Sequence, residues 1–273
     1  IYSDMKQIKF SICTASLFML MSCVDLNLNP LSEGSSENWY SSQAEIEMSL
    51  NDFYRTDFFP IDDMKWGDDV TARNETSAVN NGTLTSEDGT IAKRWENYYK
   101  GIARALRIIN NMDRARAMGV SEKDIAQYEG EAYFYLGYAY GMLAFHWGDA
   151  ILDKVGMGLD EAYTASRSPK ADVLAYSYEC LDKAAERLPN SYPGIQRATK
   201  GAAYAFKARI AIYNEDYAAA ATAAKNCMDL NVYKLHSNYQ DLFTASWSDE
   251  WIFFFRGDVT LKKYYWAASD VLN

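Results

Sequence analysis

Histidine, cysteine and proline are scarce in this chain, whose 273 residues include two histidines, four cysteines and five prolines. His146 and His236 lie far apart in the sequence, so no histidine-based metal site is indicated. The chain also has no excess of basic residues, because its formal net charge is −10, and it has no basic stripe that could contact a phosphate backbone. A nucleic-acid partner is therefore not expected. The low proline content favours helices joined by short turns.

A hydrophobic run long enough to cross a membrane is also missing. The most apolar stretch, 132–148, carries no formal charge and holds four tyrosines, two phenylalanines and a tryptophan. As a helix it would measure ~25 Å, short of the ~30 Å hydrocarbon layer, and its tyrosine hydroxyls would be unsatisfied in lipid. Because apolar residues line both sides of this stretch at helical spacing, we expect it to be the central buried helix of an all-helical protein.

The amino terminus has the pattern of a signal peptide. Lys6 and Lys9 precede an apolar run, 10–21, which is too short to span a membrane. The sequence Leu20-Met21-Ser22-Cys23 resembles a bacterial lipobox, which predicts cleavage before Cys23 and lipidation of its thiol. Ordinary signal cleavage and a chance apolar run are the alternatives.

These patterns predict three parts of the chain. Residues 24–41 are polar and rich in asparagine and serine, as expected of an extended tether. The expected division is a signal peptide over 1–22 (Ile1–Asp4 being a remnant upstream of the start), a lipidated tether over 23–41 and an incomplete helical domain over 42–273.

Two cysteines fall in the helical part. Cys180 and Cys227 each lie among apolar residues at helical spacing. Two cysteines in an exported chain can pair, but sequence alone does not place them within disulfide reach. A disulfide and a pair of buried free thiols both remain open.

Apolar spacing, caps and turn residues predict six helices and one strand-like run after residue 41. Ser121 with Asp124 is expected to open the central helix as a variant of the capping box. Trp95, Trp147 and Trp251 fall in these patterns and are expected in the core. The helices are expected over about 42–56, 91–118, 121–148, 170–188, 199–213 and 217–230, and the strand at Asp249–Phe255.

Part of the helical region has the spacing of a repeat. Tyr133, Leu136, Gly137 and Tyr140 match the tetratricopeptide opening W-x2-L-G-x2-Y, with tyrosine in place of tryptophan. A second opening begins at Tyr204, which lies 71 residues later, about two periods of 34. The fold class predicted is therefore all-α, a tetratricopeptide-like helical-repeat scaffold with long irregular loops and little strand.

The stretch 57–90 interrupts the helical pattern and carries all of the candidate ligand-binding residues. A loop this long inside a compact domain is usually functional or disordered. Sugars present apolar C–H faces to a tryptophan ring and hydroxyls to amide, carboxylate and guanidinium groups. The alternative is that the tryptophan packs the loop onto the body and the Asn and Asp residues form turns. The candidate residues are Trp66, Asp68, Asp69, Arg73, Asn74 and Asn81.

The same loop holds two pairs of adjacent aspartates, Asp62-Asp63 and Asp68-Asp69. Their oxygens could hold a structural calcium ion, but no twelve-residue calcium-loop pattern accompanies them. No cofactor is expected, and calcium remains the alternative.

Six short motifs follow one another along the chain in a fixed order. They are Cys23-Val24-Asp25-Leu26-Asn27, Asn38-Trp39-Tyr40, Trp95–Ile102, Glu131–Tyr135 with His146–Asp149, Asp182-Lys183-Ala184 with Leu188-Pro189, and Ser248–Phe253. Together these motifs resemble the SusD/RagB family of outer-membrane nutrient-binding lipoproteins of Bacteroidetes. Two positions depart from the family pattern: Glu131 replaces the usual arginine, and Ala150-Ile151-Leu152 replaces Val-Pro-Leu.

The resemblance implies a non-catalytic lipoprotein of the outer-membrane surface, anchored by lipid alone. Such a protein would bind glycans or similar nutrients and deliver them to a SusC-like TonB-dependent transporter. Because members of the family are usually much longer, we expect this chain to be an amino-terminal part.

Two other function classes are weighed against this one. A tetratricopeptide-type envelope lipoprotein that mediates protein–protein assembly is the main alternative, although it would not need the polar and aromatic loop at 57–90. An all-helical glycosidase would need two carboxylates ~5–9.5 Å apart in a cleft. The aspartates of the loop are instead adjacent pairs without a recognisable acid/base partner.

Overall fold

The computed structural model describes residues 39–55, 57–60, 78–192, 197–243 and 248–254, which, apart from Trp39, belong to the compact unit Tyr40–Asn273. In these ranges the only strand-type pairing is one antiparallel bridge, Ala150 to Ser168. The prediction of an all-helical fold with little strand is therefore confirmed. The helices are α2 (Gln43–Asn51), α3 (Gly89–Asn110), α4 (Met112–Ala117), α5 (Glu122–Trp147), α6 (Leu159–Thr164), α7 (Lys170–Arg187), α8 (Lys200–Tyr213), α9 (Tyr217–Asp229) and the 3₁₀ turn η2 (Asp241–Phe243).

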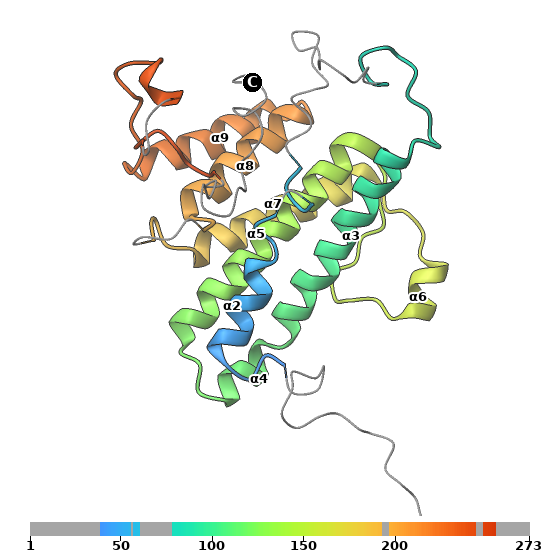
Figure 1. Ribbon diagram of the computed structural model, residues 1–273, viewed down its shortest axis with the longest axis horizontal. Coiled ribbons are helices and arrows are strands. Elements are labelled where there is room, and N and C mark those ends of the chain that lie inside the picture. The colour runs from blue at the N-terminus through green and yellow to red at the C-terminus, as the bar shows by residue number, and fades with distance from the viewer. Residues whose placement is uncertain (1–38, 56, 61–77, 193–196, 244–247, 255–273) are drawn as a thin grey trace, which may run out of the picture. The chain divides into compact units, whose positions relative to one another are not determined.

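Helix α5 occupies the centre of the fold, between α3 on one side and α7 on the other (Figure 1). It begins as predicted, because the Ser121 hydroxyl accepts the Asp124 amide at 3.1 Å and donates to the Asp124 carboxylate at 2.7 Å. Nearly all of its residues from Gly130 to Ala144 are buried. An all-round apolar surface thus serves contact with helices on several sides, as the sequence pattern indicated.

Small residues allow the central helices to approach closely. A Cβ atom on Gly137 of α5 would lie 2.5 Å from Leu181 Cγ and 2.9 Å from the Ser177 carbonyl oxygen of α7. The Ser177 hydroxyl donates to the Gly137 carbonyl at 2.6 Å, so this crossing point is hydrogen-bonded as well as packed. Gly137 is the glycine of the tetratricopeptide-like opening, and helix approach explains its place in that motif.

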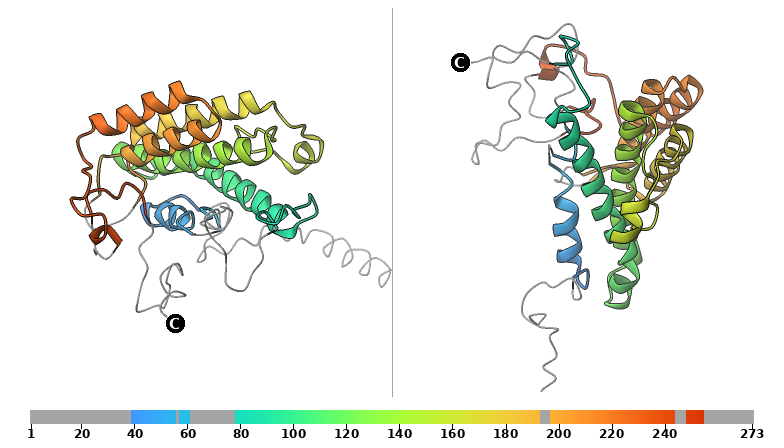
Figure 2. Two further views of the ribbon diagram at one scale, coloured as in Figure 1. Left: turned by 90° about the horizontal axis from the view of Figure 1, so that it is seen from above. Right: turned by 90° about the vertical axis from the view of Figure 1, so that its right-hand side faces the viewer.

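Helices α8 and α9 form an antiparallel pair on the side of α5 away from α2 and α3, and α8 is the member of the pair that packs on α7 and α5 (Figure 2). Both helices begin where the sequence predicted, and a side chain caps each start. Thr199 Oγ1 accepts a hydrogen bond from the Ala202 amide and Asp216 Oδ1 accepts one from the Ala219 amide, each at 3.1 Å. Successive antiparallel helices therefore stack as layers, which is the arrangement of a helical-repeat scaffold.

An aromatic cluster joins the ends of the described chain to its centre. The Phe253 ring lies 5.5 Å from Phe59 and 5.4 Å from both Phe134 and Phe206, measured between centroids. These four residues come from the segment after α2, from α5, from α8 and from the segment after η2. Segments far apart in the sequence thus share one core.

Two helix predictions were wrong in their extent. The first helix ends at Asn51 instead of near Thr56, because the following turn directs Phe53 into the core, where its ring stacks on Tyr135 at 4.8 Å. The helix predicted over 91–118 is divided at Asn111, whose side-chain amide donates to the Arg107 carbonyl at 2.7 Å. An asparagine that hydrogen-bonds to the preceding turn competes with helix continuation.

The strand predicted at Asp249–Phe255 is also wrong over the part that the structure describes. Residues 248–254 begin with a turn, in which the Trp251 amide donates to the Ser248 carbonyl at 3.2 Å. The Glu250 carboxylate accepts the His236 amide at 2.7 Å and fastens the turn to the segment after α9. The apolar residues of this run thus pack without a partner strand.

The two cysteines of the helical part are free, so the disulfide alternative is excluded. Cys180 is fully buried in α7, and burial raises the pKa of its thiol to about 12. Cys227 in α9 is also buried, with its sulfur 3.5 Å from the Gly201 carbonyl oxygen. The two thiols thus lie in different helices and are not bonded to each other.

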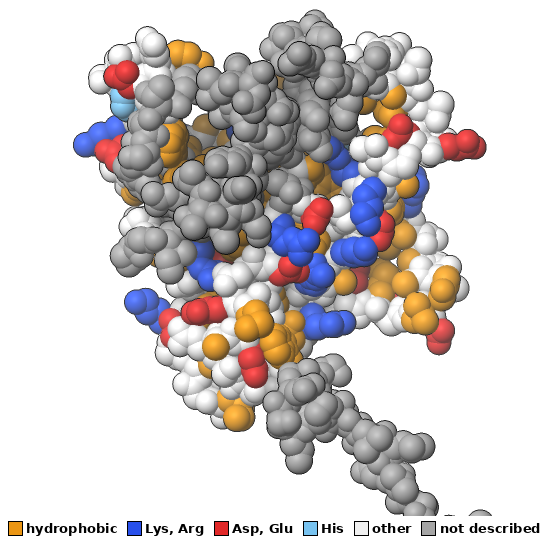
Figure 3. All heavy atoms as spheres, in the orientation of Figure 1, with side chains coloured by type: hydrophobic (Ala, Val, Ile, Leu, Met, Phe, Trp, Pro, Cys, Tyr) orange, Lys and Arg blue, Asp and Glu red, His pale blue; other side chains and the backbone are white. Residues whose placement is uncertain are grey.

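The loop between α5 and α7 carries the short helix α6. Asp153 fixes the first part of this loop. Its carboxylate accepts hydrogen bonds from the amides of Val155, Gly156 and Met157 at 2.6–3.0 Å. The backbone amide of Asp153 donates to the Tyr140 hydroxyl, and the Asp153 carbonyl accepts from it. No residue of α6 is buried, and hydrophobic side chains gather there at the right of Figure 3. Among the helices that the structure describes, none is both long and apolar enough to span a bilayer.

Candidate functional site

Most of the predicted ligand-binding residues lie outside the described residues: Trp66, Asp68, Asp69, Arg73 and Asn74, together with the lipidation candidate Cys23 and the calcium candidates Asp62 and Asp63. Their roles stay predictions. Asn81 is described, and it lies exposed in a turn over 78–82 that is closed by the Thr83 amide donating to the Ala78 carbonyl at 2.9 Å. Gly82 follows with a φ of 67°, which a glycine adopts without strain.

The chain that follows Asn81 leads directly into α3. The Asp88 carboxylate accepts the amides of Thr90 and Ile91 at 2.8 and 3.4 Å and caps the first turn of this helix. The predicted helix start near Ile91 is therefore correct to within one turn. This cap places the described end of the loop, residues 78–88, at the amino-terminal end of α3.

At that end of α3, aromatic side chains form a cluster with the last residue of α5. The Trp95 ring lies 4.9 Å from the Tyr99 ring, one turn later, and 5.4 Å from the Trp147 ring. Because α3 and α5 are antiparallel, the amino-terminal end of one meets the carboxy-terminal end of the other (Figure 1). We call Trp95, Tyr99, Trp147 and the nearby Arg167 the tryptophan cluster.

Arg167 completes the cluster with a cation. Its guanidinium carbon lies 5.2 Å from the centre of the Trp95 ring, within the range of a cation–π interaction. The neighbouring bridge holds the arginine in place, since the Ser168 amide donates to the Ala150 carbonyl at 2.8 Å and the return bond measures 3.2 Å. The Tyr99 hydroxyl donates to the Ile151 carbonyl at 2.8 Å and fixes the same connection.

The expectation that Trp95 and Trp147 are core residues was wrong, because both side chains are only partly buried. Trp95 lies in the second turn of α3 and Trp147 ends α5, so neighbouring helices cover only part of each ring. Trp251, which lies outside any helix, is also partly exposed. Helical spacing predicts the direction of a side chain but not how far the neighbouring elements extend over it.

Partly exposed indole rings beside a guanidinium group suit a ligand with both apolar faces and hydroxyls. The exposed part of each ring offers apolar surface, and the exposed Arg167 offers several hydrogen-bond donors in one plane. The sequence pattern missed this cluster because each of its aromatic residues fits a helical core stripe. The sequence did contain one signal, because one tryptophan lies near the start of a predicted helix and the other at the end of the next long one. If the two helices are antiparallel, these residues come together.

The buried carboxylate of the described body is enclosed. Glu131 is 2% exposed, and its carboxylate accepts the Tyr54 hydroxyl at 2.6 Å and the Arg197 guanidinium at 2.9 Å. A substrate cannot reach an acid that is sealed by its own partners, so Glu131 is not a general acid for glycoside cleavage. The described residues also contain no group of three or more His, Cys, Asp or Glu side chains that could hold a metal ion.

The fold and this site define a class of protein: a helical-repeat scaffold that presents an aromatic cluster beside its loops. Residues 35–212 match the model of the SusD-like family, described as "Starch-binding associating with outer membrane". The chain belongs to the SusD-like family, as its sequence motifs indicated.

Individual relatives agree with this assignment. SusD-like protein P2 of Formosa agariphila is 23% identical over 253 residues, which cover 84% of this chain and 48% of the relative. Among solved structures, a SusD-like protein from Bacteroides fragilis superposes with a TM-score of 0.67 at 23% identity, covering 80% of this chain and 45% of that one. A SusD-like carbohydrate binding protein from the same species gives 0.65 at 23% identity, covering 75% and 44%. The chain thus spans about half the length of the relatives it matches.

Proposed function

We propose that this chain is the amino-terminal helical part of a non-catalytic surface lipoprotein that binds glycans and delivers them to a TonB-dependent outer-membrane transporter. The tryptophan cluster is the observation that carries the ligand class, because its rings lie partly exposed where the Asn81-bearing loop enters α3. Membership of a family described as starch-binding supports the same ligand class.

In this proposal the loop and the cluster act on one ligand. Trp66 and Trp95 supply apolar faces for sugar rings, while Arg73, Asn74 and Arg167 bond to hydroxyl groups. Asp68, Asp69 and Asn81 add further acceptors and amide groups at the edge. Recognition of a sugar needs stacking and hydrogen bonding together, and this set of residue types provides both.

Affinity electrophoresis in gels that contain soluble polysaccharides tests the ligand class. We expect Trp66→Ala and Trp95→Ala to weaken retention by roughly tenfold, which corresponds to one lost stacking contact. Trp66→Ala should leave the thermal melt nearly unchanged. Tyr163→Ala removes an aromatic ring that is 82% exposed on α6, away from the cluster, and serves as the matched control.

Two outcomes would count against this proposal. If Trp66→Ala lowers the melting temperature as much as it lowers retention, Trp66 is a structural residue. If the unaltered chain is not retained by any polysaccharide and co-purifies with envelope proteins other than a transporter, the protein–protein scaffold is the better interpretation.

Lipid anchoring and the transporter partner are separate parts of the proposal. Cys23→Ala should release the protein from the membrane fraction, whereas Cys13→Ala, which changes a cysteine inside the predicted signal peptide, should not. Unchanged fractionation of Cys23→Ala would refute the lipid anchor. Affinity purification of the anchored protein from solubilised outer membranes should recover a TonB-dependent transporter, and its absence would remove that partner.

A further inference from the structure

The rings of the tryptophan cluster continue around the end of α5 to a second group of aromatic side chains. The His146 ring lies 5.6 Å from the Trp147 ring and 4.8 Å from the Phe145 ring, measured between centroids. The Phe145 ring stacks on Tyr213, the last residue of α8, at 4.8 Å. We call Phe145, His146 and Tyr213 the outer rings. Aromatic contacts therefore run without a gap from Trp95 on α3 to Tyr213 on α8.

These rings are partly exposed because both helices end beside them. Phe145, His146 and Trp147 are the last three residues of α5, and Gly148 ends the helix with a φ of 75°. Since successive helical residues point about 100° apart, the three rings spread around the helix end, with Trp147 toward α3 and Phe145 toward α8. Helix α8 likewise ends at Tyr213. Neither helix continues over the rings, and Phe145 is 42% exposed and Tyr213 41%.

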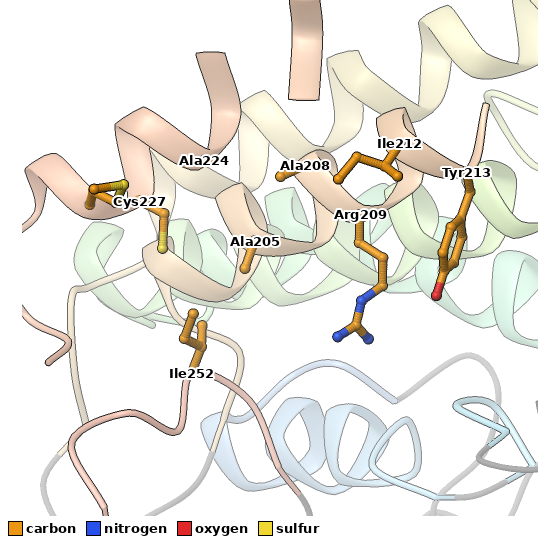
Figure 4. A pocket seen from close by; sticks show the side chains of 9 residues that line it. Ala205, Ala208, Arg209, Ile212, Tyr213, Ala224, Cys227 and Ile252 are labelled. Atoms are coloured by element: carbon orange, nitrogen blue, oxygen red, sulfur yellow. The ribbon is translucent and has the colours of Figure 1, made fainter. Parts of the chain in front are cut away.

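The surface beside Tyr213 is open in the described part of the chain. Tyr213 lies at one end of an apolar groove lined by α8 and α9, and Cys227 and Ile252 lie at the other end (Figure 4). The neighbouring Ile212 is 55% exposed. The outer rings therefore border a surface that the described residues do not cover.

We propose that the ligand is an extended glycan chain, which crosses the end of α5 and contacts both the tryptophan cluster and the outer rings. This inference rests on the glycan-binding function proposed above. Aromatic side chains offer apolar surface to sugars, and successive units of one chain can use successive rings. Trp95 and Tyr213 are separated by four ring-to-ring steps of 4.8–5.6 Å, each about the size of one sugar ring. A ligand that reaches both ends must therefore contain several linked units.

Continuity with the cluster distinguishes the outer rings from other exposed aromatic residues. Tyr163 on α6 is 82% exposed, yet it contacts no other ring among the described residues. The outer rings instead extend a site that already offers indole rings and the Arg167 guanidinium. Two contact sites for one chain increase its affinity, because binding at the first site holds the chain close to the second. A short sugar that fits the cluster alone gains nothing from the outer rings.

The dependence of affinity on the length of the sugar chain tests the inference. The full chain is titrated by calorimetry with maltose and with longer fragments of soluble starch. If the gels described above show retention by another polysaccharide, the corresponding fragments of that polysaccharide are used. We expect the affinity for the long fragments to exceed the affinity for the disaccharide by at least about tenfold.

Variants of the outer rings should remove only this gain. We expect Phe145→Leu and Tyr213→Ala each to lower the affinity for long fragments by about tenfold and to leave the disaccharide affinity within about twofold. Trp95→Ala should weaken the binding of both ligands, and Tyr163→Ala, the matched control, should weaken neither. Leucine at position 145 keeps apolar contact between α5 and α8, so the thermal melt of that variant should stay nearly unchanged. Tyr213→Leu replaces Tyr213→Ala if circular dichroism shows that the alanine variant unfolds.

Three results would overturn the inference and leave the proposed function intact. Equal affinity for the disaccharide and the long fragments would confine the ligand to the tryptophan cluster. Full affinity in both outer-ring variants, together with a loss in Trp95→Ala, would show that the outer rings do not contact the ligand. Full affinity in these variants with loss of a co-purifying transporter would identify the outer rings as a protein contact.

Failure of the proposed function itself gives a different result. In that case neither the polysaccharides nor their fragments bind the unaltered chain, and the inference fails with it.

Discussion

At the scale of single residues, Glu131 shows how a departure from a family pattern is accommodated. The carboxylate lies where the family usually has an arginine, and the structure supplies the compensating cation from Arg197, whose side chain is only 10% exposed. Tyr54 bonds to the same carboxylate and accepts the Ala198 amide at 3.0 Å. The buried Glu131 carboxylate therefore ties the segment after α2, through Tyr54, and the segment before α8, through Arg197, to α5.

Removal of Arg197 should be costly because it leaves the Glu131 charge buried without a counterion. We expect Arg197→Met to lower the free energy of unfolding by about 3 kcal/mol at pH 8, measured by urea denaturation. Lys225→Met breaks an exposed pair with Asp229 and should change it by less than about 0.5 kcal/mol.

The pH dependence of this variant gives a second check. Burial raises the pKa of the Glu131 carboxyl, and the Arg197 charge opposes that rise. A carboxyl whose pKa is raised in the folded state stabilises the fold at low pH and loses this contribution as the pH rises through the raised pKa. The deficit of Arg197→Met should therefore shrink between pH 8 and pH 5. A deficit that is constant over this range would show that packing, and not charge, causes the loss.

At the scale of elements, the crossing of α5 and α7 depends on the absence of a side chain at Gly137. We expect Gly137→Ala to destabilise the protein by about 1–3 kcal/mol, because the new Cβ would approach the Ser177 carbonyl oxygen, a backbone atom that cannot rotate away. Gly89→Ala is the matched change at the start of α3, where a Cβ meets nothing within 4 Å. It should be neutral or slightly stabilising. Equal melting temperatures for the two variants would contradict the close approach.

The element boundaries also show which local signals were sufficient. Ser121, Asp88, Thr199 and Asp216 each cap a helix close to its expected start, since a cap needs only a side chain and an amide two or three residues away. The break at Asn111 and the early end of α2 were not predicted. Apolar spacing continues through both sites. The end of α2 depends on the packing of Phe53 on Tyr135, whereas the break at Asn111 follows a local side-chain bond to the Arg107 carbonyl.

At the scale of the whole molecule, the aromatic cluster around Phe253 joins segments that lie far apart in the described chain. We expect Phe253→Ala to lower the free energy of unfolding by about 2–3 kcal/mol, because its ring contacts three segments at once. Tyr163→Ala should have almost no effect. Unfolding followed by tryptophan fluorescence and by far-UV circular dichroism should coincide in the unaltered protein. Separate transitions would mean that the α8–α9 layer unfolds on its own.

The tryptophan cluster belongs to the same scale, because it exists only where three distant parts of the chain meet. Trp95, Trp147 and Arg167 come from α3, from α5 and from the connection after α6. In the sequence each of these aromatic residues fits the apolar spacing of a helical core. The arginine follows α6, a short helix without buried residues. Only the antiparallel packing of α3 and α5 shows that the rings lie at one end of the layer, partly open to a ligand.

By itself the sequence determined the all-helical class, the central helix 122–147, its caps and the family. These properties follow from spacing, from neighbours along the chain and from motif order, all of which are local. Tertiary structure alone decided that Glu131 pairs with Arg197, that Cys180 and Cys227 stay apart, and that the described part of the predicted strand, 249–254, packs without a strand partner. Such outcomes depend on which distant surfaces exclude water together, and one-dimensional spacing does not record that.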